Sequence, residues 1–347
     1  MKAMVLDEIT HLGETARPLK LVRRPEPVPE PDEVLIRVSV CGVCHTELDE
    51  IEGRTPPSTL PIILGHEVVG YVAGRGSRAH RFEVGERVGV AWIFSACGEC
   101  TYCLSGQENL CTDFQATGRD ADGGYAEYMT VKEDFAYPIP EVFSDAEAAP
   151  LLCAGAVGYR SLRLCNLTDG QLLGLTGFGA SGHLVIQAAQ RKYPHSDIFV
   201  FARNPDERAF AEELGAVWTG ETEATAPVKL DAIIDTTPAW KPVVEALRNL
   251  APGGRLVINA IRKEAGDQDY LRQLDYATHL WMEKEIKSVA NVTRKDVRDF
   301  LALAAEIPLK PTVEEYPLTE ANRALIELRA GGIRGSKVLR ISESEKP

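Results

Sequence analysis

The sequence predicts an α/β protein with two domains, one of them built around a doubly wound parallel sheet. At 347 residues the chain exceeds what one ordinary hydrophobic core holds. Short β-like runs punctuated by glycine fill its first third, and from about residue 144 strand-like runs alternate with helical ones. Alternation of strands with helices predicts βαβ units and a parallel sheet.

The first domain is expected to be mostly β. Residues 33–40 alternate apolar and polar side chains in the manner of a half-buried strand, and a proline-rich stretch at 25–31 precedes them as an extended lead-in. Further β-like runs lie at 68–74, 86–92 and 125–131. We therefore expect strands joined by irregular loops.

The second domain is expected to begin near residue 151. Helical spacing after a possible Ser144 cap covers 144–162. Strands are then predicted at 170–176, 197–202, 230–235 and 253–261, with helices between them at 181–192, 205–216 and 241–251. From about 290 the alternation loosens, leaving a helix at 294–306 and a strand near 336–342.

Charge and composition exclude several classes of function. Hydrophobic residues make up 44% and charged residues 26%, as in a soluble enzyme. A net charge of −13 argues against nucleic acid or an anionic membrane as partner. The first ten residues include acids that a signal peptide lacks, and no apolar run is long enough for a membrane span. A cytoplasmic location is expected.

Four cysteines gather in one short segment, at Cys97, Cys100, Cys103 and Cys111. Four thiolates this close in sequence can surround one zinc ion tetrahedrally and leave no coordination position open, which defines a structural site. Free thiols, disulfides and an iron–sulfur cluster are the alternatives. The spacing favours structural zinc.

A glycine-rich turn predicts nucleotide binding. The stretch "LTGFGASGH" follows a predicted strand and opens a predicted helix, the context that a dinucleotide fold requires. Its first glycine permits the tight turn, the second lets the pyrophosphate approach, and the third lets helix and strand pack closely. A tight turn without a ligand is the alternative. The residues expected to bind the cofactor here are Gly177, Phe178, Gly179, Ala180, Ser181 and Gly182.

The end of the second strand of this unit bears on cofactor choice. An acid there would hold the ribose hydroxyls of NAD(H), but the sequence has Ala202, Arg203 and Asn204. A small residue followed by arginine admits a 2′-phosphate and can pair with it. The closest acid, Asp206, falls at the start of the next helix. NADP(H) is favoured over NAD(H).

The stretch "VCGVCHTELDE" raises a separate question, because its C-x-x-C fits a redox dithiol, half of a zinc site, or two cysteines of which one matters. His66 and Glu67 follow in "LGHEVVG", and Cys153 stands alone in "APLLCAG". A lone histidine is usually structural, so these residues by themselves leave the question open.

Taken together, the motifs resemble the zinc-dependent alcohol dehydrogenases of the medium-chain dehydrogenase/reductase superfamily. The resemblance spans nearly the whole chain, with "GVCHTEL", "GHEVVG", the four-cysteine loop, "GGYAEY", "APLLCAG" and "GFGASGH" in the expected order. It implies a GroES-like catalytic domain formed by residues 1–150 and 290–347, and a Rossmann domain at 151–289.

The resemblance also assigns the metal ligands. Cys44, His66 and Cys153 are implied to bind a catalytic zinc with a fourth position left open for water or substrate. Cys41, expected one β-turn before Cys44, is implied to be a spectator. Glu47 and Glu67 match carboxylates beside the ligands, where an acid fixes the tautomer of the histidine.

Three further expectations rest on the resemblance. Thr46 is implied to hydrogen-bond the alcohol and pass its proton toward the nicotinamide ribose. The family commonly ends this relay at a histidine where the chain has Asp49, so Asp49 or water is the expected final acceptor. Trp92 and Phe94 match a substrate-pocket region in which aromatic side chains favour unbranched primary alcohols, with core packing as the alternative.

We therefore predict an enzyme with two zinc ions per chain that transfers hydride between a primary, or secondary, alcohol or aldehyde and a nicotinamide cofactor. The family implies a homodimer or homotetramer. Two rivals are a zinc-independent quinone or enone reductase of the same superfamily and a non-catalytic zinc-stabilised nucleotide sensor.

Overall fold

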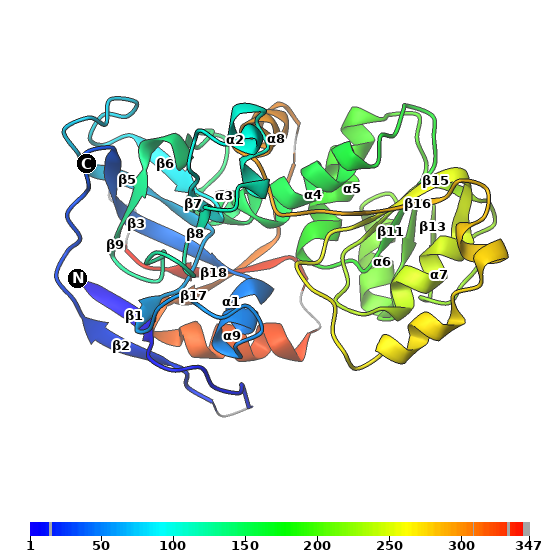
Figure 1. The fold of residues 1–347 in the computed structure, drawn as a ribbon, viewed down its shortest axis with the longest axis horizontal. Helices are drawn as coiled ribbons and strands as arrows, with labels where there is room; N and C mark the ends of the chain where they lie inside the picture. The colour runs from blue at the N-terminus through cyan, green and yellow to red at the C-terminus, as the bar shows by residue number, and fades with distance from the viewer. Residues whose placement is uncertain (14–15, 308, 332–333, 343–347) are drawn as a thin grey trace. The chain divides into compact units, whose positions relative to one another are not determined.

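The computed structural model describes residues 1–13, 16–307, 309–331 and 334–342. The chain forms two compact units (Figure 1). Unit 1 comprises Met1–Cys153, Val292–Glu306 and Lys310–Pro347, and unit 2 comprises Ala154–Asn291 and Ile307–Leu309. The boundaries expected from the sequence, after residues 150 and 289, fall a few residues earlier in each case.

Unit 1 is mostly β, as the sequence predicts, and its strands pair antiparallel except for β17 and β18, which are parallel. Its strands are β1 (Lys2–Leu6), β2 (Leu19–Arg23), β3 (Glu33–Val43), β4 (Ile62–Ile63), β5 (Val68–Arg75), β6 (Arg87–Val90), β7 (Ile93–Ser95), β8 (Gln115–Ala116), β9 (Tyr128–Lys132), β10 (Ala136–Pro138), β17 (Val313–Pro317) and β18 (Ser336–Arg340). Its helices are α1 (His45–Ile51), α2 (Thr101–Leu104), α3 (Asp145–Ala148), α8 (Arg294–Glu306) and α9 (Ala321–Ala330).

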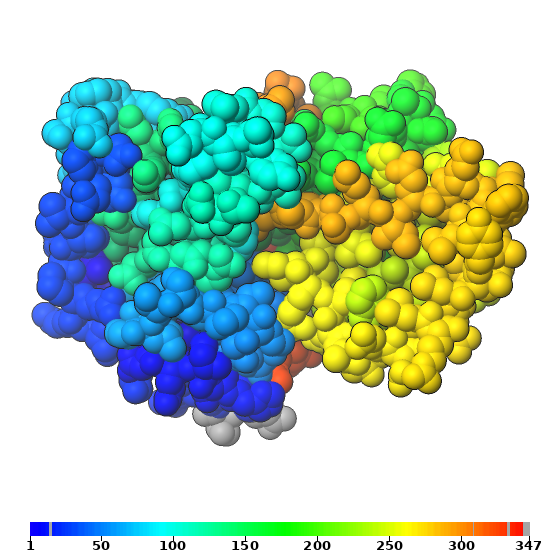
Figure 2. Space-filling view, viewed as in Figure 1, coloured from blue at the N-terminus to red at the C-terminus, as the bar shows by residue number. Residues whose placement is uncertain are grey.

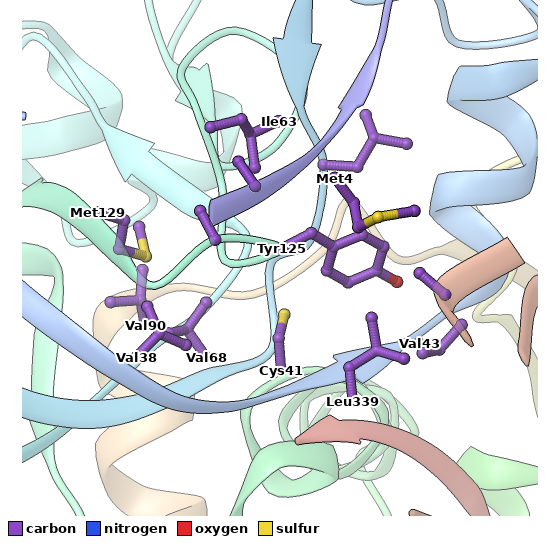
Figure 3. Close-up of a cluster of buried hydrophobic side chains, with 14 of the residues drawn as sticks. Met4, Val38, Cys41, Val43, Ile63, Val68, Val90, Tyr125, Met129 and Leu339 are labelled. Atoms are coloured by element: carbon purple, nitrogen blue, oxygen red, sulfur yellow. The ribbon is translucent and has the colours of Figure 1, made fainter. Parts of the chain in front are cut away.

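Strand β3 is the centre of unit 1. The main sheet runs β10-β6-β5-β3-β18-β17, and β9 also pairs with β3. β18 lies antiparallel to the end of β3, with Lys337 opposite Val43 and Leu339 opposite Cys41. Figure 3 shows apolar side chains of these strands packed with Met4 and Tyr125 in the core of this unit.

Unit 2 has a six-stranded parallel sheet in the order β13-β12-β11-β14-β15-β16. Its strands are β11 (Leu173–Thr176), β12 (Ile198–Phe201), β13 (Trp218–Gly220), β14 (Leu230–Asp235), β15 (Leu250–Ile258) and β16 (Glu285–Ser288), and its helices are α4 (Ala154–Leu164), α5 (Ala180–Lys192), α6 (Pro205–Glu213) and α7 (Lys241–Asn249). The chain order reverses between β11 and β14, which confirms the doubly wound α/β fold.

Alternating side chains divide unit 2 into two buried layers. In β12, Ile198 and Val200 face the cluster that contains α5 residues such as Val185, whereas Phe199 and Phe201 face the cluster that contains Val243 of α7. Successive strand residues point to opposite faces, and both faces are covered. This explains why these strands are nearly continuous apolar runs in the sequence.

The structure differs from the sequence expectations in two respects. The helical spacing over 144–162 is divided into α3, a 3-10 turn at Ala149–Leu152 and α4, because Pro150 lies in the turn and Cys153 leaves the helical region (φ −125°, ψ −77°). In addition, several elements form where the sequence pattern gave no prediction, among them β1, β2, α1, β13, β16, β17 and α9.

Across the described ranges, every helix is too short or too polar to cross a membrane.

Candidate metal centres and nucleotide-binding loop

Cys44, His66, Glu67 and Cys153 converge in unit 1, and one donor atom from each lies within 4.8 Å of all the others. Cys44 directly follows β3 as the N-cap of α1, His66 lies between β4 and β5, and Cys153 occupies the break before α4. The His66 Nε2–Cys153 Sγ distance is 3.3 Å and the two sulfurs are 4.0 Å apart. Three segments distant in sequence thus supply one cluster.

The donor set fits zinc. Two thiols and an imidazole are ligands that zinc prefers. Without a metal ion, these side chains would have few partners for their polar atoms in the protein interior. A hydrogen bond from Cys153 and the nearby His66 hold the pKa of the Cys44 thiol well below its ordinary value, which favours the thiolate that a metal requires. The residues present could therefore hold the catalytic ion that the sequence predicts.

Glu47 orients both His66 and the ligand loop. Its Oε1 lies 2.7 Å from His66 Nδ1, and its Oε2 accepts a hydrogen bond of 2.7 Å from the Cys44 amide. Glu47 and His66 are both fully buried. This short distance favours the tautomer with its proton on Nδ1, and Nε2, which lies 3.3 Å from Cys153 Sγ, is then the free ligand atom.

Glu67 is packed against backbone that only glycine permits. A Cβ atom at Gly42 would lie 2.0 Å from Glu67 Oε2, and the Gly42 amide donates to the Glu67 carbonyl at 2.9 Å. Burial, reinforced by the negative charge of Cys44, raises the pKa of Glu67 well above its ordinary value. A fourth potential ligand thus stands beside the two thiols and the imidazole.

Cys41 does not belong to this cluster. It lies within β3 and is fully buried, in the core that Figure 3 shows beside Tyr125 and Leu339. Burial raises the pKa of its thiol well above the ordinary value. The expectation that Cys41 lies one β-turn before Cys44 is wrong, because β3 continues through Val43 and a strand directs its residues alternately to opposite faces.

The residues expected to move the substrate proton lie on α1. Thr46 Oγ1 is 3.6 Å from Cys44 Sγ. The buried Asp49 accepts hydrogen bonds from Arg54, whose Nε and Nη2 lie 2.8 Å and 2.7 Å from Asp49 Oδ1. The sequence motif did not indicate Arg54 as the partner of Asp49.

The four-cysteine segment forms a second cluster on unit 1, cyan in Figure 2. Its sulfurs lie 3.5 Å (Cys97–Cys111) and 3.8 Å (Cys97–Cys103) apart, and the amides of Cys100 and Cys103 donate to the sulfurs of Cys97 and Cys100. Hydrogen bonds from the backbone, first from Glu99, lower the pKa of Cys97 to about 7, whereas burial raises that of Cys103 to about 12. All four donors belong to one loop, so the cluster fits a closed structural zinc site.

Glu108 attaches this loop to the start of helix α8. Its buried Oε1 accepts hydrogen bonds from the Arg294 amide at 2.6 Å and from Arg294 Nε at 3.2 Å. Sequence reasoning missed this contact, since the two residues are 186 positions apart.

The glycine-rich loop of unit 2 has three different glycine environments. Gly177 adopts φ +77°, and a Cβ there would meet Thr236 and Thr237 at 2.9 Å. A Cβ at Gly179 would meet nothing within 4 Å, whereas at Gly182 it would contact Phe178 at 3.1 Å. Gly177 therefore forms a tight turn, and Gly179 leaves open space in which a ligand can approach the backbone. Gly182 lets the start of α5 pack closely against the loop.

The same loop starts α5, whose N-cap Gly179 contributes no side-chain hydrogen bond. The first amides of a helix without such a cap attract anions. Phe178, Ala180 and Ser181 complete the segment between the glycines. Its chemistry fits the pyrophosphate of a nicotinamide cofactor.

The end of β12 has one feature that the sequence did not reveal. Ala202 is buried, Arg203 is exposed, and the Asn204 side chain caps α6 by accepting from the Asp206 amide. Arg208, one turn into α6, donates to the carbonyls of Ala202 (2.6 Å) and Arg203 (3.1 Å). A second guanidinium thus lies beside the predicted 2′-phosphate position.

Trp92 and Phe94 are both buried members of the core of unit 1. The Trp92 ring lies 5.2 Å from that of Phe114. Packing in the core accounts for both residues, and their part in a substrate pocket stays a prediction.

Comparison with known proteins identifies relatives over the full length. A family model described as the alcohol dehydrogenase GroES-like domain matches residues 30–141. A probable alcohol dehydrogenase, AdhA of Mycobacterium tuberculosis, is 44% identical over 93% of each chain, and an alcohol dehydrogenase of Geobacillus stearothermophilus is 33% identical over 98% of this chain and 100% of its own. A cinnamyl alcohol dehydrogenase from Sorghum bicolor superposes with a TM-score of 0.85, at 26% identity, covering 100% of this chain and 99% of that one.

Proposed function

Because this chain belongs to the alcohol dehydrogenases of the medium-chain dehydrogenase/reductase superfamily, we propose that it is a zinc-dependent enzyme that interconverts primary alcohols and aldehydes with NADP(H). The convergence of Cys44, His66 and Cys153, with Glu47 against the far side of the imidazole, is the observation that carries the proposal. These three residues would hold the catalytic zinc.

When bound, zinc supplies a Lewis acid for the substrate oxygen, and the nicotinamide supplies the hydride acceptor or donor. The side chains of the protein hold the alcohol in position and remove its hydroxyl proton. Glu47 keeps the His66 proton on Nδ1. Thr46 Oγ1, beside Cys44, accepts a hydrogen bond from the alcohol hydroxyl and relays its proton, because it gives up its own hydroxyl proton to the next acceptor as it takes up that of the alcohol. Asp49, one turn or less further along α1, is the proposed later proton acceptor, with Arg54 holding its carboxylate in place.

The four cysteines of the second cluster are proposed to bind a second zinc that has no catalytic task. A closed set of four thiolates offers no position for substrate. Zinc analysis of the purified protein tests the proposal, and two ions per chain are expected. One ion per chain would favour a zinc-independent reductase or a nucleotide sensor instead.

The preference for NADP(H) rests on Arg203 and Arg208 at the end of β12, where Ala202 offers no carboxylate. A charge-assisted hydrogen bond is worth about 1.5–3 kcal/mol, on the order of tenfold to a hundredfold in selectivity. We expect kcat/KM to be higher with NADP(H) than with NAD(H). Ala202→Asp combined with Arg203→Ile should reverse the order, because it removes attraction and adds repulsion.

Kinetics with a series of primary alcohols and both oxidised cofactors is the deciding measurement. A wild-type preference for NAD(H) would contradict the cofactor assignment and leave the alcohol dehydrogenase reaction unaffected. No turnover of any alcohol or aldehyde by protein that holds two zinc ions would contradict the proposed reaction.

A homo-oligomer is also proposed, because β16 is the last strand of the parallel sheet among the described residues. All four residues of β16 are exposed, and Ile286 among them is an apolar side chain with an exposed fraction of 47%. An exposed edge strand with an apolar side chain favours association with another strand. Light scattering should give two or four chains per particle. A cytoplasmic location stays a prediction.

A further inference from the structure

Arg119 introduces a cation beside the proposed catalytic centre that the mechanism does not use. Its guanidinium carbon lies 5.4 Å from the ring centroid of Trp92 and 5.3 Å from that of Phe114. The two rings are themselves 5.2 Å apart. The side chain keeps 23% of its surface exposed, so a small molecule can reach it.

The loop that carries Arg119 is fixed against the metal-binding segment. A Cβ at Gly118 would lie 2.8 Å from the amide nitrogen of Gly65, the residue before His66, so the two backbones touch. The Thr117 amide donates to the Trp92 carbonyl at 2.8 Å, and the Arg119 carbonyl accepts from the Ser58 amide at 3.2 Å. Arg119 therefore stays beside the centre.

Arg119 and Trp92 each have a hydrogen-bond donor that is not used. Asp120 binds Nε and Nη2 of Arg119, at 3.1 Å and 2.6 Å from its Oδ2, whereas Nη1 makes no hydrogen bond within the described ranges. The buried Nε1 of Trp92 also has no acceptor there. Buried donors without acceptors are uncommon, and an oxygen atom of a bound molecule would satisfy them.

The charges around Arg119 indicate whether the oxygen atom of the bound molecule is charged or uncharged. Asp120 already neutralises Arg119 through Nε and Nη2. A substrate carboxylate would therefore enter this partly buried place without a counter-charge, so an uncharged oxygen is the better match.

Resting on the proposed function, we propose that Arg119 determines substrate specificity by hydrogen-bonding, through Nη1, a second uncharged oxygen of an alcohol or aldehyde substrate. The substrate class is then diols, hydroxyaldehydes and alkoxy alcohols, in which this oxygen lies away from the reacting carbon. Trp92 and Phe114 hold the guanidinium in place beside their aromatic rings.

Butane-1,4-diol and pentan-1-ol, which are matched in size, test this. The measured quantity is the ratio of their kcat/KM values in the wild type, in Arg119→Met and in Arg119→Lys. Loss of a hydrogen bond to a charged donor lowers the ratio about tenfold in Arg119→Met. Arg119→Lys keeps the charge and should recover part of the ratio. 4-Hydroxybutanoate should be a poorer substrate than the diol for the wild type.

Arg81→Met is the matched control, because the Arg81 guanidinium also covers an aromatic ring, that of Phe82 at 5.2 Å, and pairs with an acid. It should leave the ratio unchanged. Calorimetric binding of the two alcohols to the cofactor complex gives the same ratio without turnover. An equal ratio in wild type and Arg119→Met, by either measurement, would overturn the proposal. Binding that depends on Arg119 without oxidation of any alcohol would instead contradict the proposed reaction alone.

Discussion

The two cysteine clusters of unit 1 are built in opposite ways. In the loop centre, Cys97, Cys100, Cys103 and Cys111, all donors come from one segment, and backbone amides of that segment bond the sulfurs. In the dispersed centre, Cys44, His66 and Cys153, the sulfurs come from residues 109 positions apart. A fully buried carboxylate, Glu47, orients the imidazole there.

This difference indicates that the loop centre stabilises the protein, whereas the dispersed centre takes part in catalysis. The loop centre offers four like ligands and no open position, so a metal there stabilises a loop that has exposed apolar residues such as Leu104 and Tyr102 instead of a core. The dispersed centre has mixed donors and a nearby hydroxyl, that of Thr46. Its geometry depends on the folded sheet, and changes there should affect turnover first.

The largest expected effect is that of Cys44→Ser. Because a hydroxyl is a poor replacement for a thiolate ligand, this change should abolish alcohol oxidation and remove about one zinc per chain. Cys41→Ser is the control, and it should lower stability by about 1–3 kcal/mol, since it buries a hydroxyl in the core, while zinc content and turnover persist. Greater loss of zinc in Cys41→Ser than in Cys44→Ser would mean that the ligand assignment is wrong.

Cys103→Ala should act on stability instead. Loss of one of four ligands should remove about one zinc and lower Tm, while the folded enzyme keeps a substantial kcat. Cys165→Ala, at a buried cysteine of unit 2 outside both clusters, controls for the loss of a thiol and should keep both ions. A stable, folded Cys103→Ala protein without activity would contradict the division between the two centres.

A smaller difference is expected between the carboxylates that support each centre. Glu47→Gln should weaken zinc at the dispersed centre about 10–100-fold, because it loses the charge beside His66 Nδ1. Glu108→Gln should lower the free energy of unfolding by on the order of 1 kcal/mol, by weakening its bonds with Arg294, and should leave metal affinity near that of the wild type. Competition with a chelator and denaturant titration measure the two effects, and equal zinc affinities in both variants would contradict the prediction.

The smallest effect concerns pH within the loop centre. In the metal-free protein, the thiolate fraction of Cys97 should rise as pH passes about 7, whereas Cys103, with its pKa at about 12, should remain a thiol up to strongly alkaline pH. Alkylation follows the thiolate, so at neutral pH Cys97 should be labelled before Cys103, and zinc should protect both. Mass spectrometry after timed alkylation measures this, and similar rates for the two residues would disagree with it.

The contrast between residues that lie in one segment and residues from distant segments also explains how much of each region the sequence predicts. The four-cysteine spacing and the glycine-rich turn lie within one loop each, so their residues could be named from local pattern alone. The parallel strands of unit 2 were predictable because burial on both faces makes them apolar runs. In the dispersed centre, the ligands could be assigned only through resemblance to a family, because no periodicity relates Cys44 to Cys153.

The individual side-chain contacts were not predictable, whether the partners are near or distant in sequence. The pairing of Asp49 with Arg54, of Glu108 with Arg294 and of Arg208 with the end of β12 depends on side-chain directions that one sequence does not specify. Short or exposed strands were missed for a related reason. β16 is exposed along its whole length and therefore lacks the apolar pattern from which strands are inferred.

The pairing of β18 with β3 has a consequence for biosynthesis. Val43, which directly precedes Cys44, lies opposite Lys337, so the ligand segment gains its neighbouring strand only from the last part of the chain. On the ribosome, residues 154–291 of unit 2 emerge as one continuous stretch, whereas the sheet beside Cys44 waits for its final strand. The four-cysteine loop takes all its donors from residues 97–111, so its ligand set is complete in the growing chain well before the strand that lies beside Cys44 is made.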